Sequence, residues 1–152
     1  MNCDVAVSKN GKEATLAVIV RDCKGTLLNG TVNSAYISSP LQGELLAIRR
    51  ACVMGKDLGL HGFTIESDNQ MAIKLSVSEL DPPWEDSAIV WDIRQLGLEM
   101  KIQFCWIKRT ANELAHAVAS KAIRGLLPSQ WVAYPPSFVI ATLAKDSSSS
   151  LL

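Results

Sequence analysis

One run of apolar residues, Ala14 to Arg21, restricts the folds open to this chain. Its residues form two apolar sets, one for each face of a strand: Leu16, Val18 and Val20 against Ala17 and Ile19. A strand with two apolar faces has to be covered on both sides, as happens inside a sheet that lies between two layers. We therefore expect this run to be an inner strand of a layered domain.

Two further strand patterns flank this run. Asn2 to Ser8 alternates with the period of a strand, and Thr26 to Val32 is rich in strand-forming residues. The connections are short: Asn10-Gly11 is a strong turn signal, and Asp22 to Gly25 forms a second turn. Short turns join antiparallel neighbours, so the first third of the chain predicts a three-stranded meander. Residues 33–39 are expected to form a loop.

Helices and strands alternate after the meander. The expected elements are a helix from Pro40 to Gly59, a strand at Phe63 to Ile65, a helix that begins at Met71, a helix capped by Ser87, a strand from Lys101 to Ile107, and a helix begun by the capping box of Thr110 and Glu113. This order predicts a mixed sheet covered by helices. A proline-broken tail follows, and we expect one domain over residues 1–146 and a disordered serine-rich tail over residues 147–152.

The composition fits one globular domain. The 152 residues are 48% hydrophobic and 20% charged, with a formal net charge of zero. A neutral chain is unlike a protein that coats nucleic acid, which is basic overall, although a local basic track remains compatible with it. Four scattered cysteines without a Cys-x-x-Cys pair predict buried free thiols in a reducing compartment.

The sequence carries no signal peptide pattern and no apolar run that could span a membrane. We therefore expect an intracellular protein of the nucleus or cytoplasm, with no membrane contact, and we expect it to be a monomer.

Three carboxylates stand out by position. Asp68 lies where a predicted strand ends and a helix begins, which is where open α/β sheets bind ligands, although an Asp there is also a common helix N-cap. Asp4 lies in mid-strand, where Asp is unusual. Glu44 lies beside the apolar stripe of its helix, and it could equally be a first-turn residue that complements the helix dipole. The pattern alone leaves both interpretations of Asp68 and of Glu44 open.

These carboxylates belong to an ordered set of short sequence words: Asn2-Cys3-Asp4, Val20-Arg21-Asp22-x-x-Gly25, Glu44-Leu45-x-Ala47-Ile48, Ile65-Glu66-Ser67-Asp68 and Ala111-Asn112-Glu113-Leu114-Ala115. Together with Leu127-Pro128, Trp131 and Pro135-Pro136 in the tail, the set resembles the plant reverse-transcriptase-like ribonuclease H domains of the ribonuclease H type 1 family. The resemblance implies an α/β, ribonuclease H-like fold, with a five-stranded mixed sheet in the order 3-2-1-4-5 flanked by helices and with Asp4 on the central strand.

The resemblance also implies an activity, a metal-dependent endonuclease that hydrolyses the RNA strand of RNA–DNA hybrids. Hydrolysis of a phosphodiester by two metal ions requires hard oxygen ligands that hold the ions roughly 3.5–4 Å apart. By resemblance, Asp4, Glu44 and Asp68 are the catalytic residues and the ligands of Mg²⁺ or Mn²⁺. Asp4 would bridge both ions, and the other two carboxylates would hold the first.

The chain departs from the family pattern at three places. His116 stands where the family has a fourth acid, Val5 replaces a Gly, and the loop Lys108-Arg109-Thr110 lacks a His that active members often carry. An imidazole is a poor ligand for Mg²⁺ but is acceptable to Mn²⁺. His116 is therefore a metal ligand, a surface residue without function, or a substitute for the loop His. The alternative function is a catalytically degenerate module that binds nucleic acid or a protein partner.

Residues that contact nucleic acid are harder to identify from the sequence. The candidates are Lys74, Lys108, Arg109 and Asn112, which would contact phosphates without reading the sequence of bases. Trp84, Trp91 and Trp106 are expected to pack in the protein rather than to stack on bases. A flavodoxin-like binder of small molecules is disfavoured, since no glycine-rich phosphate loop follows a strand.

Overall fold

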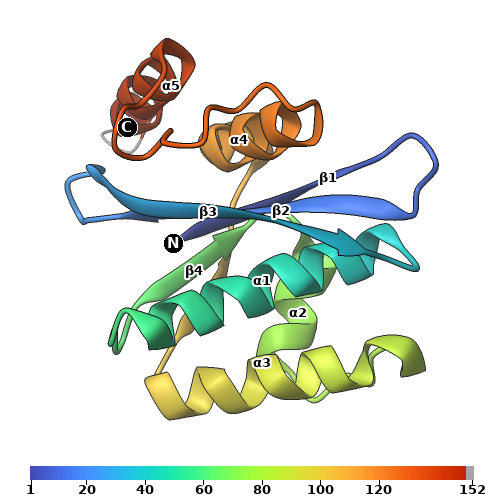
Figure 1. The fold of residues 1–152 in the computed structure, drawn as a ribbon. Helices are drawn as coiled ribbons and strands as arrows, with labels where there is room; N and C mark the ends of the chain where they lie inside the picture. Colours follow the sequence, from blue (N-terminus) through green and yellow to red (C-terminus); the bar gives the residue numbers. More distant parts are fainter. Residues whose placement is uncertain (150–152) are drawn as a thin grey trace.

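The computed structural model describes residues 1–149, which form a five-stranded mixed sheet (Figure 1). The strands are β1 (Asn2–Val7), β2 (Glu13–Arg21), β3 (Leu27–Tyr36), β4 (Thr64–Ser67) and β5 (Gln103–Trp106). Their order is β3-β2-β1-β4-β5; β1, β2 and β3 pair antiparallel, whereas β4 pairs parallel with both β1 and β5. The expected ribonuclease H-like order is confirmed, with β1 at the centre.

Helices cover both faces of the sheet (Figure 1). On one side lie α1 (Pro40–Asp57), α2 (Gln70–Val77) and α3 (Ser87–Met100), and on the other lie α4 (Glu113–Ile123) and α5 (Ser137–Ser149). Two 3-10 turns, η1 (Trp84–Asp86) and η2 (Arg109–Ala111), precede α3 and α4. Because β2 is covered by both layers, its inner residues are buried on both faces, as its two apolar sets predicted.

The two faces of β2 contribute to separate cores. Leu16, Val18 and Val20 pack with the layer that contains α1, whereas Ala17 and Ile19 pack with α4 and the tail. Each core follows from the alternation read in the sequence, because successive side chains of a strand point to opposite faces. Strand β1, which carries Asp4, is thereby held between two packed layers.

Helix ends differ from the predicted ones in a way that matters for Asp68. Asn69, not Asp68, caps α2, with its side-chain oxygen accepting a hydrogen bond of 2.9 Å from the backbone N–H of Ala72. The N-cap interpretation of Asp68 is therefore wrong. Ser87 lies inside α3, whose N-cap is Asp86. The predicted capping box is also wrong, since η2 occupies its first residues and α4 begins at Glu113.

Strand β3 continues to Tyr36, so the predicted loop over residues 33–39 is wrong in its first half. Tyr36 pairs with Glu13 and Ser34 with Thr15, which satisfies backbone groups along the whole length of β2. Pairing to an existing strand outweighs the weak strand preference of Asn33 and Ser34. Strand β5, in contrast, is shorter than the predicted Lys101 to Ile107.

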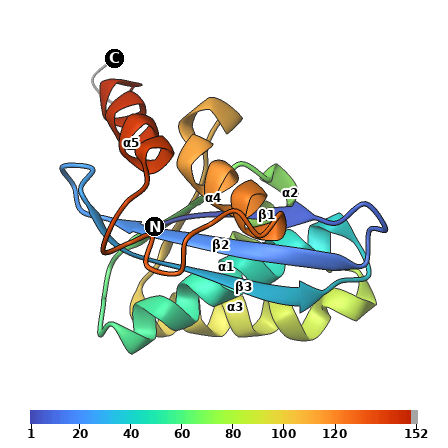
Figure 2. The same cartoon turned by 45° about the horizontal axis from the view of Figure 1, so that its top comes forward.

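The tail is part of the domain, and its helix α5 was not predicted. Trp131 is buried and lies directly over Gly30 of β3, where a Cβ atom would come within 2.3 Å of the indole ring. Asp146 of α5 forms a partly buried ion pair of 3.2 Å with Arg21 of β2. Figure 2 shows α5 beside α4, on the side of the sheet opposite α1. Residues 147–149 of the predicted disordered tail lie in α5, and residues 150–152 lie outside the described part.

Other side chains lie elsewhere than predicted. Trp84, Trp91 and Trp106 are 87%, 62% and 47% exposed, so the expectation that they pack inside is wrong. Cys3 and Cys52 are buried free thiols as expected, whereas Cys23 and Cys105 are exposed. Over residues 1–149, no helix has the length and apolar character needed to cross a membrane.

Candidate active site

Two of the three predicted carboxylates meet where β1 and β4 separate. The short parallel pairing of these strands aligns Asn2 with Glu66. Since parallel strands advance together and alternate in step, the residues two positions further along, Asp4 and Asp68, lie side by side at the carboxyl end of β4. Both side chains are almost fully buried, with exposed fractions of 0% and 8%.

The third carboxylate comes from the helix layer. Glu44 lies in the second turn of α1, on the face that packs on the sheet, and it is buried with Leu45 and Ile48. Each of Asp4, Glu44 and Asp68 offers one oxygen, and these oxygens all lie within 4.8 Å of one another. The expected convergence of the three side chains is therefore confirmed. Their catalytic role stays a prediction.

Burial and mutual repulsion make this cluster electrostatically strained. Burial, followed by the negative charges of Asp4 and Asp68, raises the pKa of Glu44 from 4.5 to about 8. The pKa of Asp4 is also raised, again by burial first and then by the charge of Asp68. A raised pKa means that the charged form of the carboxyl group is costly in this environment, and a nearby cation lowers that cost. The cluster therefore favours a bound positive charge.

The donor set fits a hard divalent ion. Among the described residues, Asp4 Oδ1 and Glu44 Oε2 are buried oxygens without a hydrogen-bond partner. Buried polar atoms are normally paired, and an unpaired one calls for an explanation such as an ion. Carboxylate oxygens are the ligands that Mg²⁺ and Mn²⁺ prefer. Asp4, Glu44 and Asp68 could therefore hold such an ion.

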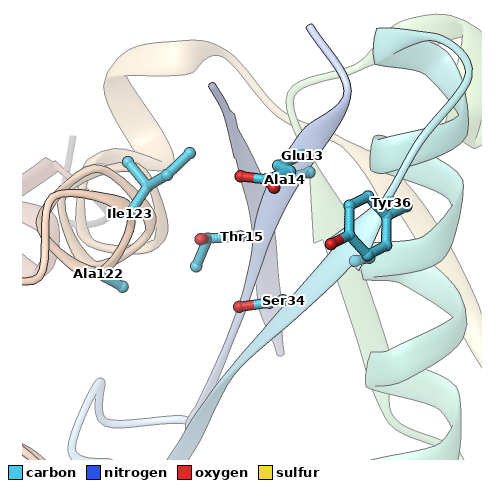
Figure 3. A pocket seen from close by; sticks show the side chains of 8 residues that line it. Glu13, Ala14, Thr15, Ser34, Tyr36, Ala122 and Ile123 are labelled. Carbon is cyan, nitrogen blue, oxygen red and sulfur yellow. The ribbon is translucent and has the colours of Figure 1, made fainter. Parts of the chain in front are cut away.

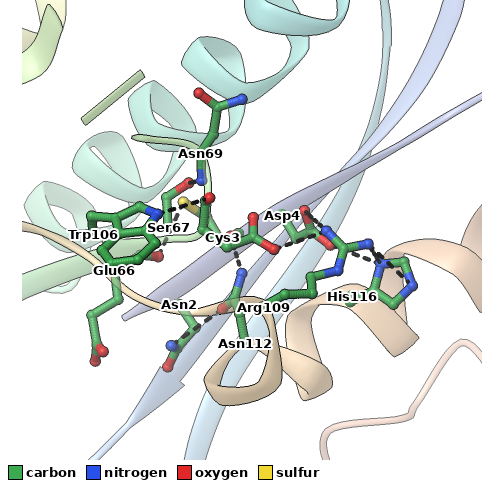
Figure 4. Close-up of polar contacts among 11 residues, drawn as sticks. Asn2, Cys3, Asp4, Glu66, Ser67, Asn69, Trp106, Arg109, Asn112 and His116 are labelled. Carbon is green, nitrogen blue, oxygen red and sulfur yellow. Dashed lines mark hydrogen bonds and ion pairs between the residues drawn. The ribbon is translucent and has the colours of Figure 1, made fainter. Parts of the chain in front are cut away.

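Arg109 also reaches into the cluster (Figure 4). One guanidinium nitrogen, Nη1, lies 2.8 Å from Asp68 Oδ2 and 3.7 Å from Asp4 Oδ1. From the sequence, Arg109 was predicted to lie in the loop before the last helix and to contact phosphates. The sequence did not predict the ion pair of Arg109 with the carboxylates. This pair depends on how the segment between β5 and α4 packs against residues 41 positions away.

His116 lies in the site rather than on an uninvolved surface. Its Nδ1 is 3.0 Å from Asp4 Oδ2, and Nη2 of Arg109 is within hydrogen-bonding distance of the same nitrogen. One ring nitrogen can donate to the carboxylate or accept from the guanidinium, but it cannot do both. The side chain is 44% exposed, so the ring forms part of the wall of the site and remains in contact with solvent.

Asn112, another predicted nucleic-acid contact, is 1% exposed and is occupied inside the protein. Its amide donates to the carbonyl of Cys3 at 2.9 Å, and its oxygen accepts from the amide of Asn2 at 3.3 Å. Asn2 in turn accepts from Arg21 at 2.6 Å. This network ties the start of α4 to β1 beside Asp4. It leaves the side chain of Asn112 almost without exposed surface for a nucleic-acid contact.

Both lysines that were predicted to contact nucleic acid lie on the surface. Lys74 and Lys108 are exposed. Val5 faces α1, where its side chain packs against Gly43. Trp106, which the sequence did not connect with the site, donates its indole N–H to the backbone carbonyl of Asp68 at 3.1 Å. The sequence around Trp106 does not indicate this contact, because its partner lies 38 residues away.

A separate pocket lies on the same side of the sheet as α4, between the ends of β2 and β3 and the last turn of α4 (Figure 3). Thr15, Tyr36 and Ile123 are among the residues that line it. None of Asp4, Glu44 and Asp68 lines this pocket.

Comparison with known proteins agrees with this architecture. A family model described as "Reverse transcriptase-like" matches residues 2–122. No curated protein sequence matches the chain. Among solved structures, RNase H1 from the halophilic archaeon Halobacterium salinarum NRC-1 is similar with a TM-score of 0.74 and 20% identity, over 82% of this chain and 96% of that one.

Two further structures show the same fold. LC11-RNase H1 in complex with an RNA/DNA hybrid has a TM-score of 0.68 and 21% identity, over 84% of this chain and 97% of that one. The foamy viral protease-reverse transcriptase in complex with dsDNA has a TM-score of 0.61 and 14% identity, over 79% of this chain and 88% of that one.

Proposed function

The chain belongs to the reverse transcriptase-like family, and from this premise we propose that it is a metal-dependent endonuclease that cuts the RNA strand of RNA–DNA hybrids. The convergence of Asp4, Glu44 and Asp68 carries the proposal. The resemblance of the structured domain to RNase H1 proteins, one of them in complex with an RNA/DNA hybrid, supports the choice of substrate.

Asp4, Glu44 and Asp68 would hold the ions, Mg²⁺ or Mn²⁺. When bound, a pair of divalent ions lowers the pKa of an attacking water and stabilises the charge on the leaving oxygen. The chain would supply the negative charge that holds such ions, and Asp4 Oδ1 and Glu44 Oε2 are buried oxygens without a hydrogen bond.

Neighbouring residues position the carboxylates. Trp106 holds the backbone at Asp68 from the side of β5, and Asn112 holds the carbonyl next to Asp4 from the side of α4. A backbone held in this way keeps the attached carboxylate in place when a charged ligand arrives, which is the general use of supporting hydrogen bonds at metal sites. These residues thus act through the carboxylates rather than on the substrate.

The surface beside the cluster suits a nucleic-acid strand. Hollows lie on both sides of His116, one bounded by Arg109 and Thr142, the other by Val5 and Ser120. Exposed Lys74 and Lys108 would contact phosphates, and Arg109 would join them after leaving the carboxylates. Phosphate contacts of this kind position the substrate and carry no sequence preference.

A catalytically degenerate module is the second candidate, and a specific contact favours it. His116 takes the position of a fourth acid, and Arg109 forms ion pairs with two of the remaining three carboxylates. Such a protein would bind nucleic acid or a protein partner without cutting.

One experiment separates the two candidates. A labelled RNA–DNA hybrid, an RNA duplex and a DNA duplex are incubated with the protein in Mg²⁺ or Mn²⁺, with Asp68→Asn as the matched control. Cleavage of the RNA strand of the hybrid alone, lost in Asp68→Asn, supports the proposed nuclease. Binding of the hybrid in a fluorescence anisotropy assay without cleavage in either metal supports the degenerate module instead.

A further inference from the structure

The acidic cluster already has a cationic partner within the chain. Nη1 of Arg109 lies 2.8 Å from an oxygen of Asp68 and 3.7 Å from an oxygen of Asp4. Figure 4 shows the guanidinium pointing toward Asp4 and His116. A guanidinium is always charged, and its fork of donors matches carboxylate oxygens. Arg109 and a divalent ion would therefore compete for the same two carboxylates.

Arg109 can leave this position by giving up its contacts with Asp68, Asp4 and His116. Its side chain is 55% exposed and comes from the short turn η2, so it can move without repacking the core. It also lines a hollow between α4 and α5, bounded by Glu113 and Thr142. The buried carboxylates, in contrast, are fixed by β1, β4 and α1. If a divalent ion competes with the guanidinium for the carboxylates, Arg109 is therefore the side chain that moves.

We propose that Arg109 is a displaceable plug of the metal site: it holds Asp68 and Asp4 in the metal-free protein and moves to a phosphate of bound nucleic acid when a divalent ion takes the carboxylates. The inference rests on the proposed function. It adds that metal and nucleic acid bind cooperatively, because a bound metal releases the guanidinium for a phosphate, and a bound phosphate releases the carboxylates for the metal.

The cooperativity follows from the population of the unplugged state. A ligand that binds only the fraction of molecules with free carboxylates has its affinity reduced by that fraction. Nucleic acid gives the displaced guanidinium a phosphate to bind, and so increases the fraction with free carboxylates. Removing the guanidinium by mutation should have the same effect on the metal without any nucleic acid.

The test measures Mn²⁺ binding directly by isothermal titration calorimetry, without any activity assay. Arg109→Gln should bind Mn²⁺ about tenfold more tightly than wild type, the factor expected when a charged hydrogen-bonded partner no longer competes. The matched control is Arg124→Gln, which removes the same charge from an exposed arginine whose Nε bonds to the Ser120 carbonyl. Its Mn²⁺ affinity should stay within about twofold of wild type.

A second titration tests the cooperativity. Double-stranded DNA offers phosphates without a cleavable RNA strand, and at saturation it should tighten Mn²⁺ binding by wild type but not by Arg109→Gln. Equal Mn²⁺ affinities of wild type and Arg109→Gln would overturn the inference. So would an equal gain in Arg124→Gln, because the effect would then be one of overall charge.

The proposed function and the inference can fail separately. If Asp68→Asn abolishes Mn²⁺ binding but Arg109→Gln leaves it unchanged, the metal site stands and the plug is wrong. If Arg109→Gln binds Mn²⁺ more tightly and DNA acts as expected, yet no variant cuts the hybrid, the plug stands and the nuclease is wrong. If neither wild type nor Arg109→Gln binds Mn²⁺, both are wrong.

Discussion

Nδ1 of His116 lies 3.0 Å from Oδ2 of Asp4, so an imidazole borders the carboxylate that would bridge two metal ions. A second ion on this side would have Asp4 as a carboxylate ligand but no further acid at position 116, which matters more for Mg²⁺ than for Mn²⁺. The choice of residue at this one position should therefore decide which metal supports cleavage.

We expect His116→Asp to raise the Mg²⁺-supported rate of hybrid cleavage at least about tenfold, which corresponds to about 1.4 kcal/mol of barrier. The Mn²⁺-supported rate should change less, because Mn²⁺ already accepts nitrogen. Single-turnover cleavage in each metal gives both rates. Adding Asp68→Asn to this variant should abolish the activity. If wild type is active and His116→Asp leaves its Mg²⁺ rate unchanged, the imidazole has no part in metal binding.

The raised pKa of Glu44, about 8, makes the stability of the metal-free protein depend on pH. Below the ordinary value of 4.5 both folded and unfolded chains hold the proton, and the contribution to stability is complete. Between that value and about 8 the unfolded chain releases the proton first, so folding stability falls as pH rises. We expect a lower melting temperature in EDTA at about pH 8.5 than at about pH 5.5.

Glu44→Gln removes the titrating group and should flatten this pH dependence. It should also stabilise the metal-free protein near pH 8 by an amount on the order of 1–3 kcal/mol, since a buried charge no longer forms. Glu79→Gln, which changes an exposed residue, serves as the control and should leave the profile intact. Mn²⁺ should stabilise wild type more than Glu44→Gln. A wild-type profile that rises from pH 5.5 to 8.5 in EDTA would contradict this explanation.

Much of this architecture could be read from the sequence because it follows from local chemistry. The two apolar faces of Ala14 to Arg21 place β2 inside the sheet. The family words placed Asp4, Glu44 and Asp68 on three elements that the fold then brings together. Each of these inferences depends on residues close to one another along the chain or on an ordered set of short motifs.

The missed features depend on contacts between distant segments. Arg109 pairs with a carboxylate 41 residues away, and Asn112 bonds to a strand residue 109 positions away, so neither partner is visible from its neighbours. An Asn before a helix normally indicates a cap or an exposed contact, and only tertiary packing turns it inward. Helix α5 was missed for the same reason, since Arg21, the ion-pair partner of its residue Asp146, lies on β2.

Asn112→Ala should destabilise the fold without directly removing a nucleic-acid contact. The change leaves the buried amide of Asn2 and the carbonyl of Cys3 without their partner, which costs about 1–3 kcal/mol. Urea unfolding in EDTA measures the loss. Lys108→Ala is the converse variant, because it should weaken hybrid binding in an anisotropy assay and leave unfolding unchanged. Hybrid affinity lost in Asn112→Ala at unchanged stability would restore Asn112 as a contact.

Gly30→Ala should detach the tail from the sheet. A Cβ atom at this position would lie 2.3 Å from Cη2 and 2.7 Å from Cζ2 of Trp131, and the rigid indole ring has no flexible end that could give way. We expect a loss of about 1–3 kcal/mol in the free energy of unfolding, together with faster proteolysis between α4 and α5. Thr31→Ala, at a partly exposed neighbouring position of β3, is the matched control and should change both measurements little.

Trp131→Ala removes the indole ring itself. Gly30→Ala in that background should therefore cost almost nothing more in the free energy of unfolding, as coupling between two contacting residues requires. Two losses that simply add in the double mutant would show that Gly30 and Trp131 act independently.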